Sequence, residues 1–188
     1  MEPGGAHDGE VIAASLAEPP RFTEIFDRHF AAVFSYCVRR LGRSFGEDVA
    51  SASFVEAFVA RGRFDQTRAS ARPWLLGIAT NLVRRHHRAE QRRVRAYSRA
   101  HEPETDDQAS RDDRVQAQLL APQLAAALSQ LTSDDKDVLL LYAWAELSYQ
   151  EIADALQIPV GTVRSRLHRA RGIVRTGLEQ ETTRGASQ

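Results

Sequence analysis

The sequence is poor in the residues that cross-link a chain or anchor it in a membrane. Cys37 is the only cysteine among 188 residues, which excludes an intramolecular disulfide and a cysteine-based zinc cluster. The longest run of branched aliphatic residues, Val138–Leu141, falls far short of the roughly 20 apolar residues that a membrane-spanning helix needs. The first ten residues contain acids but no lysine or arginine, unlike a secretory signal. We therefore expect a cytoplasmic protein without direct membrane insertion.

Sequence motifs of the common catalytic sites are missing as well. The chain has no Walker-type phosphate loop, no HExxH or GxSxG pattern, and no Cys–His pair close together in the sequence. His29, His101 and His168 are far apart, and none has a partner that spacing alone would justify. The adjacent His86 and His87 point to different sides of a helix, which disfavours a metal site. We expect neither enzymatic activity nor a cofactor.

The formal net charge is zero, but the charged side chains are strongly segregated along the chain. Basic and acidic side chains number 25 each. Residues 61–100 hold 11 basic side chains against 2 acidic ones, and residues 159–178 hold 5 basic against none. Residues 101–120 and 121–158 each contain 6 acidic side chains and few basic ones. Two basic blocks separated by acidic stretches indicate two surfaces that bind polyanions.

The apolar residues follow a helical period through most of the chain. From Phe22 onward they recur at three- and four-residue spacing, after a leader rich in turn formers and small residues. Gly42 and Gly46 interrupt the first helical stretch. Pro73 is well placed to begin a later helix, because the N–H that proline lacks has no partner at a helix start. No strand alternation is sustained, so the sequence predicts an all-α fold.

A stretch around His101–Arg114 has no apolar periodicity and is acidic, which is typical of a solvated linker between two helical domains. The predicted organisation is a disordered leader (1–20), a first small helical domain (21–95), an acidic flexible linker (96–119), a second small helical domain (120–181) and a disordered tail (182–188).

The segment from Leu147 to Val174 has the pattern of a helix-turn-helix. Ser148 and Glu151 fit a capping box at the start of a first helix, and a short break around Gln157 precedes a second one. A buried stripe on the second helix is formed by Val163, Leu167, Ala170 and Val174. The neighbouring stripe carries Arg164, Ser165, His168, Arg169, Arg171 and Arg175. Such a face suits the DNA major groove, and the alternative is an ordinary solvated helix face.

These residues resemble a known family. The stretch Leu147–Leu156 followed by Pro159–Arg171 looks like region 4 of bacterial sigma-70-family factors, specifically the extracytoplasmic-function (ECF) group. In that family the second helix binds the −35 promoter element. The resemblance implies contacts to DNA by Arg164, Ser165, Arg166, His168, Arg169 and Arg171. Gln157 stands where the family usually has glycine, and a positive φ at a non-glycine residue costs about 1–2 kcal/mol.

A second basic surface is expected in the first domain. A dense arginine run follows the helix that begins at Pro73, and the preceding loop adds Arg61, Arg63 and Arg68. A basic patch beside aromatic residues is typical of proteins that bind unpaired strands, although a solvated helix end is an alternative. Trp74 suits either the core or a base-stacking platform. Cys37 suits a small core residue better than a redox sensor.

This domain resembles region 2 of the same family. The segment Arg72–Asn81 looks like the one that opens and reads the −10 element. By that likeness Asn81 and the loop Asp65–Arg72 hold a flipped non-template base, and a pocket must recover the few kcal/mol of unstacking. The implied −10 contacts are Arg72, Trp74, Asn81, Arg84, Arg85 and Arg88.

The resemblance also implies protein partners. The family docks on the β′ clamp helices of core RNA polymerase through a helix that here contains Asp48, Val49 and Phe54. The amide and acid usual after Asp48 are replaced by Ser51 and Ala52. The β flap of the polymerase, promoter DNA and an anti-sigma factor are the further partners that the likeness implies.

The leading hypothesis is therefore an ECF-type sigma factor that performs no covalent chemistry. The alternative is a stand-alone helix-turn-helix regulator that binds operator DNA and uses its first domain for dimerisation or ligand sensing. The second basic surface argues against that alternative, because a sensing domain does not need one. The acidic linker fits either a soluble spacer or a mimic of nucleic acid in the polymerase channel.

Overall fold

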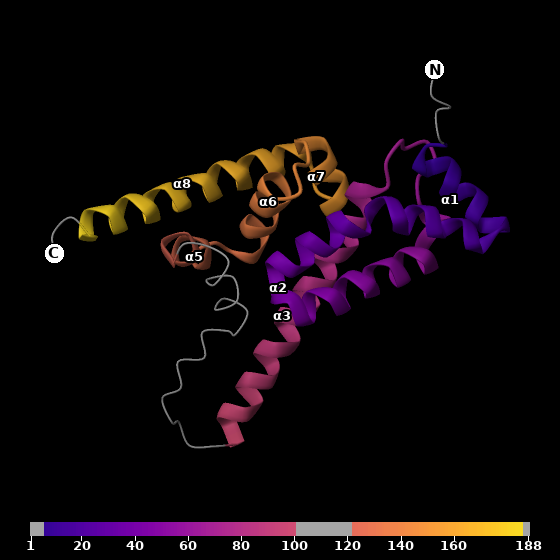
Figure 1. Ribbon diagram of the computed structural model, residues 1–188. Coiled ribbons are helices and arrows are strands. Elements are labelled where there is room, and N and C mark those ends of the chain that lie inside the picture. The colour runs from indigo at the N-terminus through magenta and orange to yellow at the C-terminus, as the bar shows by residue number, and fades with distance from the viewer. Residues whose placement is uncertain (1–5, 101–121, 186–188) are drawn as a thin grey trace.

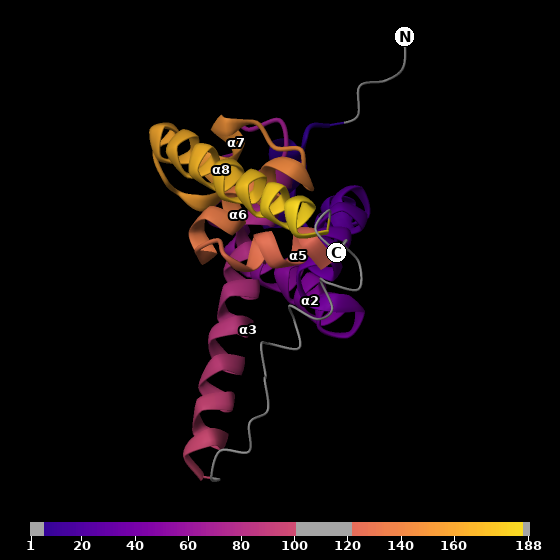
Figure 2. The same ribbon diagram turned by 90° about the vertical axis from the view of Figure 1, so that its left-hand side faces the viewer.

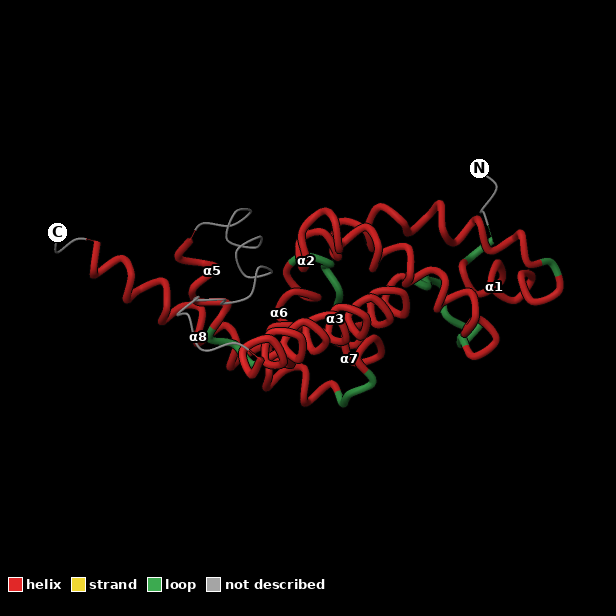
Figure 3. The backbone as a smooth tube through the Cα atoms, turned by 90° about the horizontal axis from the view of Figure 1, so that it is seen from below, coloured by secondary structure: helices red, strands yellow, loops and turns green. Residues whose placement is uncertain are grey.

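The computed structural model describes residues 6–100 and 122–185, and within these ranges the regular elements are all helical (Figure 1 and Figure 3). The all-α prediction is thereby confirmed for the described residues. The elements are α1 (Asp8–Ala17), η1 (Pro19–Phe22), α2 (Thr23–Ala60), η2 (Arg61–Arg63), α3 (Arg72–Ala100), α5 (Pro122–Ser129), α6 (Ser133–Ala143), α7 (Tyr149–Leu156) and α8 (Val160–Gly185). We call α1 to α3 the N-terminal lobe and α5 to α8 the C-terminal lobe.

Helix α2 is a hairpin of two helical arms, as the glycine interruption predicts. Gly42 has φ 76° and ψ 173°, which glycine adopts readily because it has no Cβ. The two arms approach so closely that a Cβ on Gly46 would lie 2.6 Å from the Cα of Val38. Further along the arms, the rings of Phe26 and Phe54 pack edge to face with centroids 4.9 Å apart. The hairpin therefore supplies one side of the N-terminal core.

The first half of helix α3 packs in that core, and the second half extends beyond it. Its first turns bury Leu75, Leu76, Ala79 and Val83 completely. Its second half extends away from the rest of the described chain in both side views (Figure 1 and Figure 2). The side chains of this projecting half are mostly exposed, including the arginines Arg88, Arg92, Arg93 and Arg95. Part of the basic block is thus presented to solvent on a single helix.

The predicted role of Cys37 as a core residue is confirmed. Its side chain is fully buried on the first arm of α2. Burial raises the pKa of the Cys37 thiol to about 12, so the reactive thiolate is not formed near neutral pH.

The predicted disordered leader is wrong for the described residues from position 8 onward. His7 and Glu10 form a capping box at the start of α1, and η1 follows up to Phe22. Val11 and Ile12 are buried in the N-terminal core, and this burial stabilises α1. Turn-forming residues lie on both sides of this short apolar patch, so the composition of the first twenty residues indicated a loose leader rather than a helix. Residues 1–5 lie outside the described part.

The other predicted boundaries also shift where the structure can test them. Helix α3 continues to Ala100, five residues beyond the predicted end of the first domain at 95. Helix α8 continues to Gly185, so the first residues of the predicted disordered tail are helical. Positions 101–121, which contain most of the predicted linker, and positions 186–188 lie outside the described residues.

The two lobes pack directly against each other, which the sequence analysis did not predict. A Cβ on Gly77 of α3 would lie 2.3 Å from the carbonyl oxygen of Ala155 in α7, so only glycine allows this approach. Arg40 of α2 and Asp137 of α6 are both buried and form an ion pair at 2.7 Å. Buried apolar side chains of both lobes belong to one continuous cluster, in which Leu76 and Ile152 are fully buried.

Candidate nucleic-acid and polymerase interfaces

Helices α7 and α8 form the predicted helix-turn-helix. The Ser148 hydroxyl accepts from the Glu151 N–H at 3.3 Å, and the Glu151 carboxylate accepts from the Ser148 N–H at 2.8 Å, which completes the capping box. Gln157 ends α7 with φ 54° and ψ 47°, the left-handed conformation that the family achieves with glycine. Its N–H bonds to carbonyls of the preceding turn. The short turn thus brings α8 directly after α7.

The predicted faces of α8 are as expected at its N-terminal end. Val163, Leu167 and Ala170 are buried against the lobe. Arg164, Ser165 and His168 are exposed on the other side, and Arg175 continues the exposed face further along the helix. The Ser165 hydroxyl donates to the Thr162 carbonyl of its own helix at 3.0 Å. The front of α8 therefore presents basic and small polar groups outward.

The remaining three predicted contacts on α8 are already engaged within the C-terminal lobe. Arg169 donates two hydrogen bonds, at 2.8 and 2.7 Å, to the carboxylate of the buried Asp135, and they hold the pKa of that carboxyl below its usual range. Arg166 donates to Asp134 at 2.6 Å. The Arg171 guanidinium lies 4.7 Å from the centroid of the Tyr142 ring. These three arginines are held in place before any ligand binds.

On α3, four of the predicted −10 residues share one face. Trp74, Asn81, Arg85 and Arg88 are separated by seven, four and three residues, which places them in one row of the helix. Asn81 and Arg88 are exposed, and Arg85 pairs with Glu56 of α2. The Trp74 ring packs against the Phe64 ring, with centroids 4.9 Å apart, and Trp74 is half-buried. Both roles considered for Trp74 remain compatible with this position.

Two other predicted −10 residues face the C-terminal lobe instead of solvent. Arg72 donates to the carbonyl oxygen of Ala145 at 2.8 Å. Arg84 pairs with Asp134 at 2.9 Å and also with the buried Asp137. Neither arginine is free to contact a phosphate in this arrangement of the lobes.

A third arginine of the N-terminal basic block joins this interface. Arg68 donates to Asp154 of α7 at 2.5 Å, and this bond lowers the pKa of the Asp154 carboxyl. The acids of the second lobe thus act as partners for arginines of the first. Sequence reasoning missed these pairs, although the opposite charges of 61–100 and 121–158 were a signal that it could have used.

The loop between η2 and α3, residues 64–71, leads directly into the first turn of α3. The Asp65 carboxylate accepts from the N–H and hydroxyl of Thr67 at 3.1 and 2.7 Å. The Ser70 hydroxyl accepts from the Arg72 N–H at 3.2 Å, at the start of α3. All side chains from position 65 to 70 are exposed. The conformation of this loop is therefore not fixed by packing of its side chains in the core.

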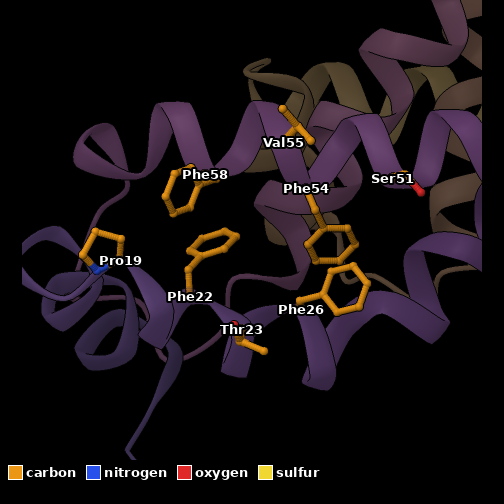
Figure 4. A pocket seen from close by; sticks show the side chains of 8 residues that line it. All are labelled: Pro19, Phe22, Thr23, Phe26, Ser51, Phe54, Val55 and Phe58. Atoms are coloured by element: carbon orange, nitrogen blue, oxygen red, sulfur yellow. The ribbon is translucent and has the colours of Figure 1, made fainter.

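The predicted polymerase-binding residues lie on the second arm of α2, beside an aromatic groove (Figure 4). Asp48 is exposed, Val49 is half-buried, and Phe54 is only 5% exposed because its ring belongs to the core. The groove has a volume of about 550 Å³ and is lined by Pro19, Phe22, Thr23, Phe26, Ser51, Phe54, Val55 and Phe58. Val55 and Val59 are 65% and 77% exposed. The sequence pattern did not indicate that these two valines are exposed or that they belong to a binding surface.

Two further observations apply only to the described residues. No group of three or more His, Cys, Asp or Glu side chains in that part of the chain is arranged to hold a metal ion. None of the helices in 6–100 and 122–185 is both long and apolar enough to cross a membrane.

Comparison with known proteins identifies the family of the chain. A model of Sigma-70 region 2 matches residues 25–94, and a model of Sigma-70, region 4 matches residues 122–172. The chain is 34% identical to the ECF RNA polymerase sigma factor SigC of Mycobacterium tuberculosis over 139 residues, which are 74% of this chain and 73% of SigC. The chain belongs to the ECF family of RNA polymerase sigma factors.

Further relatives agree with this assignment. The sigma factor is 31% identical to the ECF RNA polymerase sigma factor SigW of Bacillus subtilis over 168 residues, covering 84% of this chain and 88% of SigW. Its fold is similar to that of CnrH, solved in complex with the cytosolic domain of CnrY, with a TM-score of 0.64 and 24% identity. That likeness covers 92% of this chain and 97% of the solved one.

The family match confirms the predicted function. Region 2 corresponds to the N-terminal lobe and region 4 to the C-terminal lobe. This sigma factor binds core RNA polymerase and directs promoter recognition, DNA melting and transcription initiation. The alternative of a stand-alone operator-binding regulator gains no support, because the N-terminal lobe matches region 2 rather than a sensing domain.

Proposed function

We propose that the sigma factor reads the −35 element through the front of α8 and the melted −10 element through α3 and the loop before it. The exposed, acid-free front of α8 is the observation that carries this assignment. Its basic and polar side chains project outward from a helix that the turn at Gln157 places at the edge of the lobe. An α-helix fits the B-DNA major groove, where such groups read base edges and phosphates.

Each α8 residue receives a role from its surroundings. Arg164 and His168 are exposed near the start of the helix, where recognition helices contact base edges, and Ser165 lies between them. Arg166, Arg169 and Arg171 contact the phosphate backbone. Arg169 is 57% exposed even while paired with Asp135, so a phosphate can approach the guanidinium from the open side.

The N-terminal lobe carries the second part of the proposal. Asn81 and the loop Asp65–Arg72 hold a base flipped out of the non-template strand, and Trp74, whose ring packs against Phe64 just before this loop, supports them. Arg85 and Arg88, one and two turns further along the same face, contact the upstream duplex backbone. Arg72 and Arg84 can join them only after they leave their partners in the C-terminal lobe. The lobe interface therefore separates when both promoter elements are bound.

Core RNA polymerase binds along the second arm of α2. Exposed Asp48 offers a charge and half-buried Val49 an apolar contact, while Phe54, mostly buried, lines the groove of Figure 4. Val55 and Phe26 extend this apolar surface. Contiguous exposed apolar surface of this kind is typical of protein interfaces, and the clamp helices of the β′ subunit would cover it. The C-terminal lobe contacts the β flap.

The sigma factor acts by binding alone, without covalent chemistry of its own, and in the cytoplasm. An anti-sigma factor remains a predicted partner of this chain. A fold similar to this one, with a TM-score of 0.62 and 20% identity, was solved for the sigma factor RpoE of Bartonella quintana in complex with the anti-sigma factor NepR. That likeness covers 84% of this chain and 96% of the solved one.

Reconstitution of the purified chain with bacterial core RNA polymerase on a pool of promoter-bearing DNA tests the proposal. Transcripts that start at defined sites only when both components are present give the two promoter elements. Arg164→Ala is expected to weaken −35 binding by about 1–3 kcal/mol, because it removes a contact to a base edge. Arg175→Ala is the control, since it removes the same charge from the same face beyond the reach of the groove.

The second surface is tested on the same promoter. Asn81→Ala is expected to impair strand opening and leave −35 binding intact, and Gln91→Ala, an exposed amide on α3, is the control. Wild-type −35 affinity with Arg164→Ala, or wild-type strand opening with Asn81→Ala, would contradict the assignment of the corresponding surface. A chain that shifts duplex DNA alone and never directs initiation would favour the operator-binding alternative.

A further inference from the structure

The loop that leads into α3 is held at its ends by the buried Phe64 and Ala71, and its exposed part is tied to helix α1. Asp8, the first residue of α1, is 4% exposed and makes four contacts. One carboxylate oxygen accepts from the N–H of Ala71 at 2.7 Å. The backbone N–H of Asp8 donates to the carbonyl of Ala69 at 3.2 Å. Two backbone groups at the end of the loop are therefore satisfied by one residue of a helix more than sixty positions earlier in the chain.

The next residue of α1 sets the other side of the loop. A Cβ on Gly9 would lie 2.0 Å from the carbonyl oxygen of Gln66 and 2.9 Å from that of Arg68. The absence of a side chain at position 9 is thus what allows the middle of the loop to lie against α1. Any substitution there pushes on loop backbone rather than on a flexible side chain.

Asp8 is itself fixed from the first arm of α2. Its carboxylate contacts the Nε2 atom of His29 at 2.5 Å and accepts from Arg28 at 2.9 Å. Arg28 also donates to the Ala6 carbonyl at 2.8 Å, just before α1. Burial alone would raise the pKa of the Asp8 carboxyl, but the hydrogen bonds from Ala71, Arg28 and His29 outweigh it and lower this pKa. The carboxylate is therefore charged and held at neutral pH.

We propose that α1 is a brace for the −10 recognition loop, and that Asp8 and Gly9 are positioning residues for the flipped base. The proposal rests on the proposed function, which assigns that base to the loop and Asn81. The side chains from position 65 to 70 are exposed, and Arg68 can face DNA once it leaves Asp154 of the C-terminal lobe. The backbone contacts with α1 therefore supply order that side-chain burial does not supply here. A pocket whose backbone is ordered before binding loses no further conformational entropy when the base enters.

Fork-junction DNA tests the brace. The holoenzyme is assembled from the full chain and core polymerase, and it binds a fork of a promoter found by reconstitution, with the −10 non-template strand unpaired. A second fork has an abasic site at the flipped position, and the ratio of the two affinities measures recognition of the base. Asp8→Ala is expected to lower this ratio about tenfold, because the charge-assisted hydrogen bond from the Ala71 N–H is lost. Gly9→Ala is expected to lower it in the same direction by displacing Gln66.

Two controls separate positioning from loss of stability. Glu18→Ala removes an exposed acid at the other end of α1, away from the loop, and should leave the ratio unchanged. Leu41→Ala empties a buried site at the tip of the α2 hairpin and lowers stability without touching the loop. At a temperature where all variants are folded by circular dichroism, Leu41→Ala should keep the wild-type ratio.

The outcomes are distinct. A wild-type ratio in both Asp8→Ala and Gly9→Ala, with discrimination intact in the wild-type chain, overturns the brace alone. A ratio that falls equally in Leu41→Ala also overturns it, because the effect then follows from stability. A wild-type holoenzyme that does not distinguish the two forks overturns the assignment of the −10 pocket, and the brace with it. Loss confined to the two α1 variants, with unchanged core-polymerase and −35 affinity, supports the proposal.

Discussion

Replacing Gly77 with alanine should separate the two lobes while strengthening the helix that carries the substitution. Gly77 lies inside α3, where the added Cβ would be 2.3 Å from the Ala155 carbonyl oxygen of α7. Both partners are backbone, so neither can rotate away as a side chain would. Ordinary van der Waals contact begins near 3.4 Å, so α7 must withdraw from α3 by about 1 Å.

Two energies of opposite sign follow from this geometry. Alanine is favoured over glycine inside a helix by about 0.5–1 kcal/mol, so the N-terminal lobe gains stability. If the lobes stayed together, the withdrawal would stretch the Arg40–Asp137 pair while both charges remained buried, at a cost approaching about 3–5 kcal/mol, whereas separation of the lobes lets water reach both charges. The loss at the interface exceeds the gain in the helix, so the lobes should separate without unfolding.

Small-angle scattering of the full chain measures this separation as a larger radius of gyration, and thermal unfolding measures the lobes themselves. Gly172→Ala is the matched control, because it makes the same exchange within α8 where nothing lies within 4 Å of the new Cβ. That variant should gain the helix stability and keep the wild-type radius. A Gly77→Ala chain with the wild-type radius, or with a destabilised N-terminal lobe, would refute the reasoning.

Three further predictions concern single buried or strained residues. Gln157→Gly should raise the free energy of unfolding by about 1 kcal/mol, because it relieves a left-handed non-glycine residue; chemical denaturation that shows a loss would contradict this. Arg40→Met should destabilise the chain by less than the cost of a wholly unpaired buried charge, about 3–5 kcal/mol, because Asp137 keeps its pair with Arg84, and the double variant with Asp137→Leu should recover part of this loss in a double-mutant cycle. Cys37 has a pKa raised by burial from 9.0 to about 12, so stability should fall as the pH rises above 9, where the unfolded thiol ionises first. Alkylation of Cys37 that is equally fast in native and urea-unfolded protein would contradict its burial.

Local patterns in the sequence predicted the local structure well. Ser148 and Glu151 are three residues apart, and the buried stripe from Val163 lies on one helix, so period and capping chemistry were sufficient to find the helix-turn-helix. The positive φ of Gln157 was also expected, because the family position that it occupies usually holds glycine. The break of α2 at Gly42 followed from its glycine in the same way.

Contacts between distant segments could not be read from the sequence. Gly77 looks like any helical glycine until α7 is placed beside it. The opposite charges of 61–100 and 121–158 indicate that these stretches attract each other, but nothing near Arg72 or Arg84 identifies the group that each arginine contacts. Helix α1 was missed because only Val11 and Ile12 form its core contact, and turn formers flank them on both sides. Packing and pairing at long range decide these features, and one sequence does not encode them in any local pattern.

The ion pairs between the lobes have a consequence for how the sigma factor responds to ionic strength. Added salt weakens contacts between arginine and DNA phosphates, because it reduces the entropy gained when condensed cations are released. The same salt screens Arg68 from Asp154 and Arg84 from Asp134, two partly exposed pairs that compete with DNA for these guanidinium groups. The two effects oppose each other. Promoter affinity should therefore fall less steeply with salt than the number of arginine–phosphate contacts alone would require.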